Sequence, residues 1–172
     1  MSGSHPDGKL DTLKFAVDNN VKTILDVGAG KGMYYDALEY YAHKRLHQFD
    51  ALEVWEPYIK KYDLLSKYDN VYIEDVRAWD NFNYDLVILG DVLEHMTKEE
   101  AIEVWSRICK QAKYAVISIP IIHYPQGESE GNPYQVHVKE DWTTKEVLET
   151  FDHIVDHIEY KVVGVFFAQF NN

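Results

Sequence analysis

The sequence lacks several features that would each define a class of protein. Its only cysteine, Cys109, cannot form a disulfide within the chain, and it lies where apolar residues recur at helical spacing, which predicts burial. No apolar run approaches the roughly 18 residues of a membrane span, and the N-terminus lacks the basic and apolar regions of a signal peptide. We therefore expect a cytoplasmic protein with no membrane span and no disulfide framework.

Positive charge is also scarce. The chain has 17 Lys and Arg residues against 29 Asp and Glu residues, which gives a formal net charge of −12 at pH 7. Such a surface repels phosphate backbones and anionic lipid headgroups. Nucleic acid is therefore not an expected partner.

The length of 172 residues suits one domain with a full core. Residues 1–8 look like a tag or a disordered end, and we expect residues 9–172 to form a single domain. An amphipathic segment at 10–18 precedes a regular alternation of apolar runs and segments of helical period, which is typical of a layered α/β domain. Strands are predicted at residues 23–27, 48–53, 71–73, 85–89 and 115–119, and helices at 33–42, 58–67 and 98–110, the last opened by a capping box of Thr97 and Glu100.

The C-terminal part follows a different pattern. A helix is predicted at 143–151, followed by two strands at 154–160 and 162–170 around Gly164. Two strands joined without a helix must run antiparallel. We therefore expect a mostly parallel sheet that ends in an antiparallel hairpin.

The most informative segment is the apolar strand that runs into Gly28, Gly30 and Gly32. Glycines at this spacing let the backbone approach a ligand closely, and the amides that open the next helix favour a carboxylate or phosphate. Taken alone the pattern also fits a dinucleotide site, since an acid, Glu53, follows at about 20 residues. However, Met33 stands where that pattern has its third glycine, and no Gly-Lys-Ser or Gly-Lys-Thr of a P-loop occurs.

Four acids stand at the ends of successive predicted strands: Asp26, Glu53, Asp75 and Asp91, the last in Asp91-Val92-Leu93-Glu94-His95. This ordered series resembles the class I S-adenosylmethionine-dependent methyltransferases, over roughly residues 20–120 and, in pattern, over the final hairpin. The resemblance implies a three-layer, Rossmann-like α/β fold with strand order 3-2-1-4-5-7-6. It also implies S-adenosyl-L-methionine as cofactor and S-adenosyl-L-homocysteine as product.

The resemblance further implies roles for individual residues toward the cofactor. Asp26 matches the acid that orients the amino group, Glu53 the acid that accepts hydrogen bonds from the ribose hydroxyls, and Asp75 the acid that contacts the adenine amine. The amide of Val76 is expected at the adenine ring. The remaining cofactor-binding predictions are the backbone of Gly28 and Gly30, Trp55 over the adenosine, and Gly90 with Asp91 beside the methionine portion and the methyl group.

Residues 123–142 form a long polar and aromatic segment after the fifth strand, which we interpret as a substrate loop. If the acceptor is a hydroxyl, a base must remove its proton, and His123, His137 and Asp91 are the candidates. His95 is expected to support the site. Hydroxyl-rich ligands are bound by amides, carboxylates and aromatic faces, so the predicted substrate residues are Tyr124, Glu128, Asn132 and Trp142.

A narrower resemblance concerns small methyltransferases that act with glycosyltransferases in surface-polysaccharide synthesis. It is carried by residues 120–127 (PIIHYPQG), by Asn132-Pro133-Tyr134, and by the spacing from His137 to Trp142. The resemblance implies O-methylation of a sugar or glycan, by a chain that is part of, or a partner to, a glycosyltransferase.

Several alternatives stay open at this point. The chain fits a small-molecule N- or carboxyl-methyltransferase, a non-catalytic S-adenosylmethionine-binding module, or an NAD-binding oxidoreductase. His123, Glu128 and His137 are metal-ligand types, but their irregular spacing matches no metal-binding signature, so no metal is expected. The sequence leaves open which histidine is the base and which acceptor is methylated.

Overall fold

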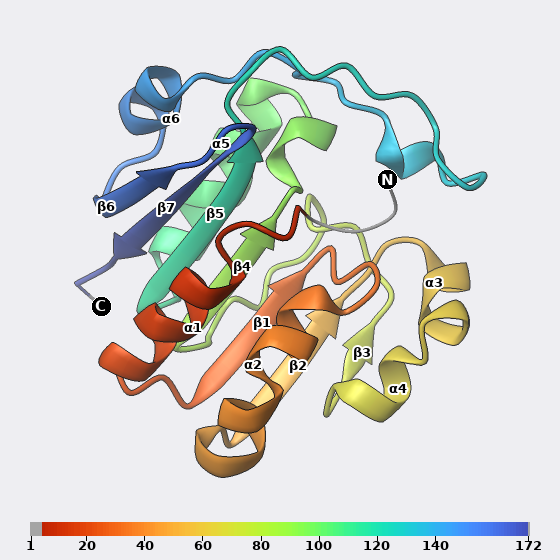
Figure 1. The fold of residues 1–172 in the computed structure, drawn as a ribbon, viewed down its shortest axis with the longest axis vertical. Helices are drawn as coiled ribbons and strands as arrows, with labels where there is room; N and C mark the ends of the chain where they lie inside the picture. The colour runs from red at the N-terminus through yellow and green to blue at the C-terminus, as the bar shows by residue number, and fades with distance from the viewer. Residues whose placement is uncertain (1–4, 172) are drawn as a thin grey trace.

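The fold is a seven-stranded sheet in the order β3-β2-β1-β4-β5-β7-β6 (Figure 1). It was obtained as a computed structural model, which describes residues 5–171. Strands β1 to β5 run parallel, and β7 is antiparallel to both β5 and β6, so the predicted fold class and strand order are confirmed. The strands are β1 (Thr23–Val27), β2 (Gln48–Leu52), β3 (Val71–Tyr72), β4 (Leu86–Gly90), β5 (Tyr114–Pro120), β6 (Ile154–Glu159) and β7 (Val163–Gln169).

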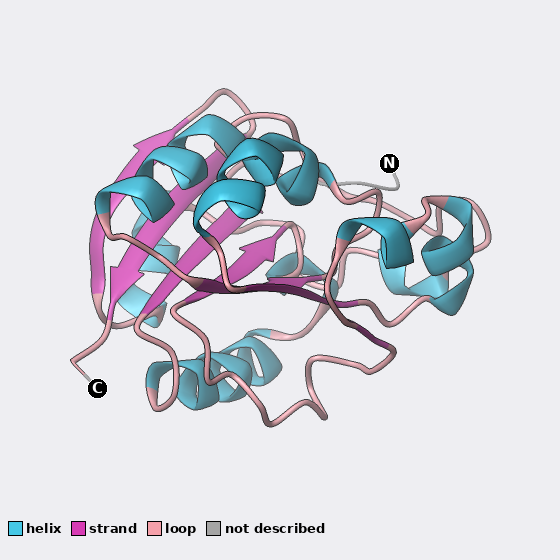
Figure 2. Cartoon of the chain, turned by 90° about the horizontal axis from the view of Figure 1, so that it is seen from below, coloured by secondary structure: helices cyan, strands magenta, loops and turns pink. Residues whose placement is uncertain are grey.

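Helices cover both faces of the sheet (Figure 2). Helices α1 and α2 lie on one face and α5 on the other, and α6 packs on the same side as α5. The α-helices are α1 (Lys9–Asp18), α2 (Met33–Arg45), α3 (Glu56–Lys61), α4 (Leu64–Lys67), α5 (Lys98–Cys109) and α6 (Thr144–Thr150), and the 3₁₀-helices are η1 (Leu93–His95) and η2 (Pro133–Gln135).

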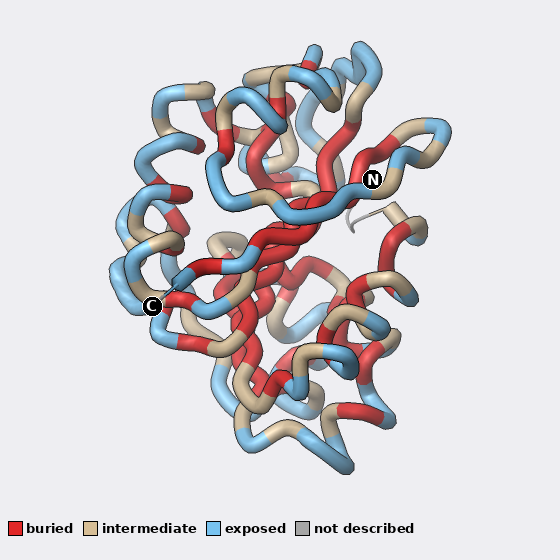
Figure 3. The backbone as a smooth tube through the Cα atoms, turned by 90° about the vertical axis from the view of Figure 1, so that its left-hand side faces the viewer, coloured by how far each residue is buried: buried red, intermediate tan, exposed pale blue. Residues whose placement is uncertain are grey.

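The central strands are buried on both faces, which explains why their sequences are continuously apolar. Successive residues of a strand point to opposite faces, so Ile24 joins the core under α1 and α2 whereas Leu25 joins the core under α5. Figure 3 shows this buried interior beneath exposed loops. The two cores fix the sheet, and with it the ends of the strands where ligands can bind.

Most predicted elements are within one or two residues of those observed, with two differences. The helix predicted at 58–67 is two helices, α3 and α4, separated at Asp63, whose φ of 51° is left-handed and cannot continue an α-helix. The helix predicted at 33–42 continues to Arg45. The capping box is confirmed, since Thr97 and Glu100 each bond the other's backbone N–H, at 2.8 and 3.2 Å.

The N-terminal segment bears on the prediction that residues 1–8 are a tag or a disordered end. Residues 1–4 lie outside the described part of the chain. In residues 5–8, the backbone N–H of His5 donates to Asp91, and Gly8 precedes α1 with a φ of 83°, packed so closely that an added Cβ would meet Val165 at 2.3 Å. Over the described range, this segment therefore packs on the body of the domain.

Cys109, the only cysteine, is half-buried at the end of α5. Within residues 5–171, none of the helices has the length and apolar character needed to span a bilayer.

Residues 121–143 connect β5 to α6 and pass over the carboxyl ends of the parallel strands (Figure 1). Backbone hydrogen bonds hold this segment down: the N–H of Val138 and that of Lys139 both donate to the carbonyl of Glu94, at 2.8 and 3.0 Å. Within the segment, the N–H of His137 donates to the carbonyl of Gln126 at 2.9 Å. The segment is thus tied to η1, next to the end of β4.

Candidate functional site

A pocket opens at the carboxyl ends of the parallel strands. The strand order reverses beside β1, because β2 and β3 lie on one side of it and β4 and β5 on the other, and ligands of open α/β sheets bind at such a point. Both the strand ends and the 121–143 segment line the pocket. Its lining includes Gly28, Gly30, Glu53, Asp75, Val76, Arg77, Gly90, Asp91, Glu94, His95, Tyr124, Gln126, Asn132, Tyr134, Gln135 and His137.

The glycine turn after β1 forms one wall. Gly28 has a φ of 67°, and a Cβ built on it would lie 2.7 Å from Val92, so only glycine fits this position. Its N–H donates to the carbonyl of Leu52 at 2.7 Å, which fixes the turn against β2. The pocket therefore has a wall of bare backbone.

Glu53, at the end of β2, connects this turn to the next wall. Its carboxylate accepts hydrogen bonds of 2.8 Å from the backbone N–H of Gly30 and from that of Trp55. Burial raises the pKa of Glu53, while these N–H donors act in the opposite direction. This side chain, the predicted ribose contact, is 4% exposed and lines the pocket.

Asp26 lies behind the turn. It is fully buried, and it is absent from the residues that line the pocket in the described part of the chain. Burial raises the pKa of Asp26 to about 7, against the opposing effects of the Tyr68 hydroxyl and the Lys9 ammonium. Asp26 was predicted to contact the cofactor's amino group, but in this structure its side chain lies behind the pocket wall.

Another wall of the pocket is formed by residues that follow β3. Asp75 and Val76, the predicted adenine contacts, line it together with Arg77. The guanidinium of Arg77 donates to both oxygens of Asp75 at 2.6–3.1 Å and also to Glu100 at 3.0 Å. Burial acts to raise the pKa of Asp75, but the hydrogen bonds from Arg77 outweigh burial and lower it.

Trp55 does not contribute directly. It is half-buried, its ring lies 6.2 Å from that of Tyr134, and it is not among the described residues that line the pocket. Its link to the site is the hydrogen bond from its backbone to Glu53.

Gly90 ends β4 and Asp91 follows it, and both residues line the pocket. A Cβ on Gly90 would lie 2.2 Å from the ring of Tyr34, so the backbone here is in direct contact with α2. Asp91 has a left-handed φ of 55°, and its carboxylate accepts from the backbone of His5 and, at 3.4 Å, from the hydroxyl of Ser118. Burial raises the pKa of Asp91, against the charge of Lys9.

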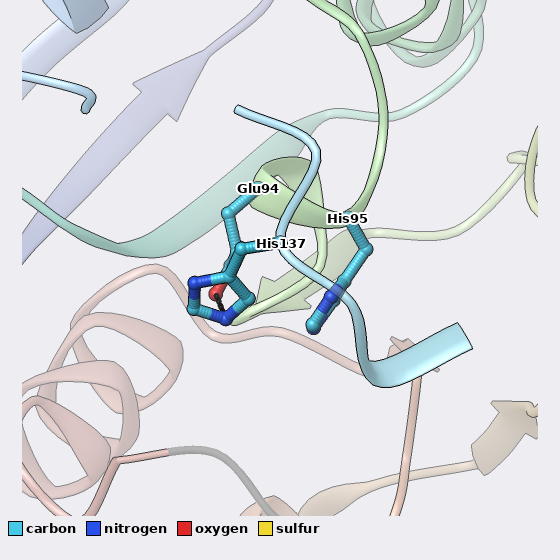
Figure 4. Close-up of side chains that lie close together, drawn as sticks. All are labelled: Glu94, His95 and His137. Atoms are coloured by element: carbon cyan, nitrogen blue, oxygen red, sulfur yellow. Dashed lines mark ion pairs between the residues drawn. The ribbon is translucent and has the colours of Figure 1, made fainter. Parts of the chain in front are cut away.

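Glu94, His95 and His137 lie close together at the pocket (Figure 4). The two imidazole centroids are 4.9 Å apart, and Nε2 of His137 lies 4.0 Å from Oε1 of Glu94. Burial lowers the pKa of His95 to about 4 and also lowers that of His137, which favours the neutral form of each ring, whereas burial raises the pKa of Glu94. Glu94 was not among the predicted site residues, and its only signal in the sequence is its place in the 91–95 motif.

Not all predicted acceptor residues come together at the pocket. Tyr124, Asn132 and His137 line it, whereas His123 and Glu128 are exposed and do not. The His123 side chain is 66% exposed, with Nε2 4.0 Å from Glu140. The two residues are therefore not brought together with His137.

Trp142 also differs from the expectation of a substrate contact. It is 1% exposed in the core, with its ring 5.6 Å from that of Phe151 and with the Lys139 ammonium 4.7 Å from its centroid. The indole packs in the core beside α6, at the end of the loop. Trp142 is thus a packing residue, and the sequence pattern could not distinguish a buried tryptophan from an exposed one.

Comparisons with known proteins agree with this geometry. The family model described as a methyltransferase domain matches residues 25–117, more than half of the chain. The comparison with curated proteins found no match.

Among solved structures, the fold is similar to an S-adenosylmethionine-dependent methyltransferase from Clostridium acetobutylicum (TM-score 0.71, 9% identity, covering 95% of this chain and 91% of that one). It is also similar to the 1,6-didemethyltoxoflavin-N1-methyltransferase of Burkholderia thailandensis with bound S-adenosylhomocysteine (0.70, 18%, 97% and 78%). A third similar structure is the N-terminal domain of EvdMO1 in the presence of S-adenosylhomocysteine and D-fucose (0.68, 13%, 96% and 84%). The chain belongs to the methyltransferase-domain family and is a class I S-adenosylmethionine-dependent methyltransferase.

Proposed function

We propose that the enzyme transfers the methyl group of S-adenosylmethionine to a hydroxyl of a sugar or glycan. The observation that carries this proposal is the polar and aromatic lining that residues 124–137 give to one side of the pocket. Tyr124 and Tyr134 are 37% and 41% exposed, and Gln126 and Asn132 lie between them in sequence. Aromatic faces stack on sugar rings while amides bond their hydroxyls, so this wall suits a sugar.

The residues present also fit the cofactor. The glycine turn offers backbone without side chains, and a carboxylate, Glu53, lines the pocket at the end of the neighbouring strand. Asp75, Val76 and Asp91 also line the pocket. We propose that these residues hold the ribose, the adenine and the methionine portion in that order.

When bound, the cofactor supplies a methyl group already activated by a positively charged sulfur. The protein must then orient the acceptor oxygen and help it lose its proton. His137 and Asp91 both line the pocket, which supports assigning them to this activation, whereas the exposure of His123 argues against a part for it.

The rival functions differ in what they need from the pocket. A small-molecule amine or carboxylate needs no strong base, and a non-catalytic module needs only the cofactor site. The B. thailandensis structure is of an N1-methyltransferase, and the EvdMO1 domain was crystallised with D-fucose present; at 18% and 13% identity, each shows the fold alone. The choice of acceptor therefore rests on the residues of this chain. The motif at 120–127 supports the further proposal that the enzyme works with a glycosyltransferase.

The first experiment is calorimetric titration of the protein with S-adenosylmethionine, S-adenosylhomocysteine and NAD in parallel. We expect binding of both adenosyl ligands and none of NAD. The protein is then incubated with S-adenosylmethionine and panels of sugars, nucleotide sugars and glycans, alongside amines and carboxylic acids, and products are detected by the mass of one added methylene.

Variants test whether turnover depends on the proposed sugar-binding wall formed by residues 124–137. Tyr134→Ala should raise KM for a sugar acceptor, whereas Tyr40→Ala, an 81% exposed tyrosine on α2, is the matched control. Methylation of amines or carboxylic acids alone, or no turnover with any acceptor, would contradict the proposed function.

A further inference from the structure

Glu94 carries a buried carboxylate without a hydrogen-bond partner in the described part of the chain. The residue is 1% exposed, and neither of its carboxylate oxygens has a hydrogen-bond partner within residues 5–171. Its backbone carbonyl is occupied by the N–H groups of Val138 and Lys139, so the position of the residue is fixed. An ionised carboxylate in such a place costs several kcal/mol unless a cation joins it.

Two imidazoles beside it are held in one orientation. Nδ1 of His95 lies 3.0 Å from the carbonyl oxygen of Val136, and Nδ1 of His137 lies 2.5 Å from that of Tyr124. A carbonyl oxygen only accepts, so each Nδ1 carries the hydrogen, and each Nε2 keeps its lone pair. This arrangement, with one ring nitrogen bonded to the backbone and the other able to coordinate, is that of metal-binding histidines.

The three side chains come from two elements that meet at the pocket. Glu94 and His95 lie on η1, and His137 lies on the segment that η1 holds down (Figure 4). One ligand atom from each residue lies within 4.8 Å of the others, and the His137–Glu94 pair is at 4.0 Å. Ligands at about 2.1 Å from a metal ion are about 3–3.5 Å apart, so the widest separation in the set needs to contract by about 1.5 Å.

From this geometry we infer that Glu94, His95 and His137 bind a divalent transition-metal ion. Two imidazoles and one carboxylate suit Mn²⁺, Fe²⁺, Co²⁺ or Zn²⁺ better than the hard ions Mg²⁺ and Ca²⁺, which prefer oxygen. All three residues line the pocket, so an ion that they held would be within reach of a ligand bound there. This assignment replaces the expectation that the protein has no metal.

Within the proposed function, on which this part of the inference rests, the ion would also activate the acceptor hydroxyl. It would bind the acceptor hydroxyl and lower its pKa, so that its proton passes to solvent water. His137 then serves as a ligand and not as the base. A base role and a ligand role for His137 predict different responses to chelators.

The test uses the full chain without a polyhistidine tag, freed of metal with a chelator and then desalted. MnCl₂, CoCl₂ and ZnCl₂ are titrated separately by calorimetry, without cofactor or acceptor, and Co²⁺ binding is followed by its visible absorption. We expect one ion per chain. Glu94→Gln and His137→Asn should each weaken binding about tenfold or more.

Controls separate binding at this cluster from binding elsewhere. His43→Ala and Glu103→Gln change exposed residues of α2 and α5 and should bind the ion as the wild type does. Thermal melting shows whether the variants fold: in chelator, Glu94→Gln should melt no lower than wild type. Added ion should raise the Tm of the wild type and of the two controls but not that of Glu94→Gln. No binding to the wild type at millimolar ion, or equal binding by Glu94→Gln and His137→Asn, would overturn the site.

The two proposals fail separately. If the ion binds but no sugar is methylated, the acceptor proposal fails and the metal site stands. If a sugar is methylated at the same rate in the presence of a chelator, the role of the ion fails, and His137 is left as a base.

Discussion

The Tyr68 hydroxyl donates a 2.5 Å hydrogen bond to the Asp26 carboxylate, behind the glycine turn and out of reach of solvent. Among the effects on this carboxylate, burial is the largest, and it raises the pKa from 3.8 to about 7. Asp26 is therefore a buried acid, behind the glycine turn, whose charge changes near neutral pH.

This acid makes the stability of the cofactor-free enzyme depend on pH. Because the folded protein holds the Asp26 proton more tightly than the unfolded chain, the stabilising contribution is complete below pH 3.8 and is lost as pH rises to about 7. Asp26→Asn should remove this loss, and at pH 8 it should raise the free energy of unfolding by about 2–4 kcal/mol. Urea unfolding across this pH range measures the effect, and Asp18→Asn, an exposed aspartate, is the control. Identical pH profiles for wild type and Asp26→Asn would contradict it.

Glu53→Gln should weaken cofactor binding. The substitution keeps the shape of the side chain but removes the charge that accepts from the backbone of Gly30 and Trp55. Hydrogen bonds to a charged group contribute about 1.5–3 kcal/mol, so we expect the Kd for S-adenosylhomocysteine to rise by about tenfold or more. Calorimetry measures the change, and Glu103→Gln on the exposed face of α5 should have no effect. An unchanged Kd for Glu53→Gln would remove this residue from the site.

Trp142→Ala should act on stability. The ring is 1% exposed and packs on Phe151, so its removal leaves a large cavity that we expect to cost about 3–5 kcal/mol. Trp142→Phe should cost less, and Tyr134→Ala, at a 41% exposed position, should leave the free energy of unfolding nearly unchanged. Chemical denaturation measures all three. A Trp142→Ala protein with wild-type stability and a raised acceptor KM would restore the sequence-based prediction that Trp142 contacts substrate.

Gly28→Ala should lower the free energy of unfolding for two separate reasons. Its φ of 67° disfavours any side chain, and its new methyl group would contact Val92, which lies 2.7 Å away. We expect a loss of about 1–3 kcal/mol. The double variant with Val92→Ala should lose less stability than the sum of the single variants, since only the steric cost is relieved. Additive losses in a double-mutant cycle would show that the backbone conformation carries the whole effect.

The fold was predictable because its strands are buried on both faces and separated by helices of clear period. The acids at the strand ends could be found for the same reason: a strand boundary is visible in the sequence, and Glu53, Asp75 and Asp91 each follow one. The break between α3 and α4 was not visible, because it depends on one left-handed residue, Asp63, within a run of helical period.

The acceptor side of the site was harder to predict because it depends on how a loop folds back. His123 and His137 are equivalent by composition, and only the backbone path exposes one and buries the other. The same holds for Trp142, whose burial is set by α6. Glu94 was missed because a missing hydrogen-bond partner is a property of three dimensions alone.

The loop over the pocket is fastened by main-chain groups: Tyr124 to Glu140, His137 to Gln126, and Val138 and Lys139 to Glu94. None of these bonds depends on which side chains project into the pocket from Tyr124 or Tyr134. We therefore expect that the aromatic residues of the proposed acceptor wall can be replaced while the path of the loop stays intact. A library of variants for laboratory evolution toward new acceptors should therefore vary Tyr124 and Tyr134. Glu94, whose carbonyl holds the loop through Val138 and Lys139, should be kept.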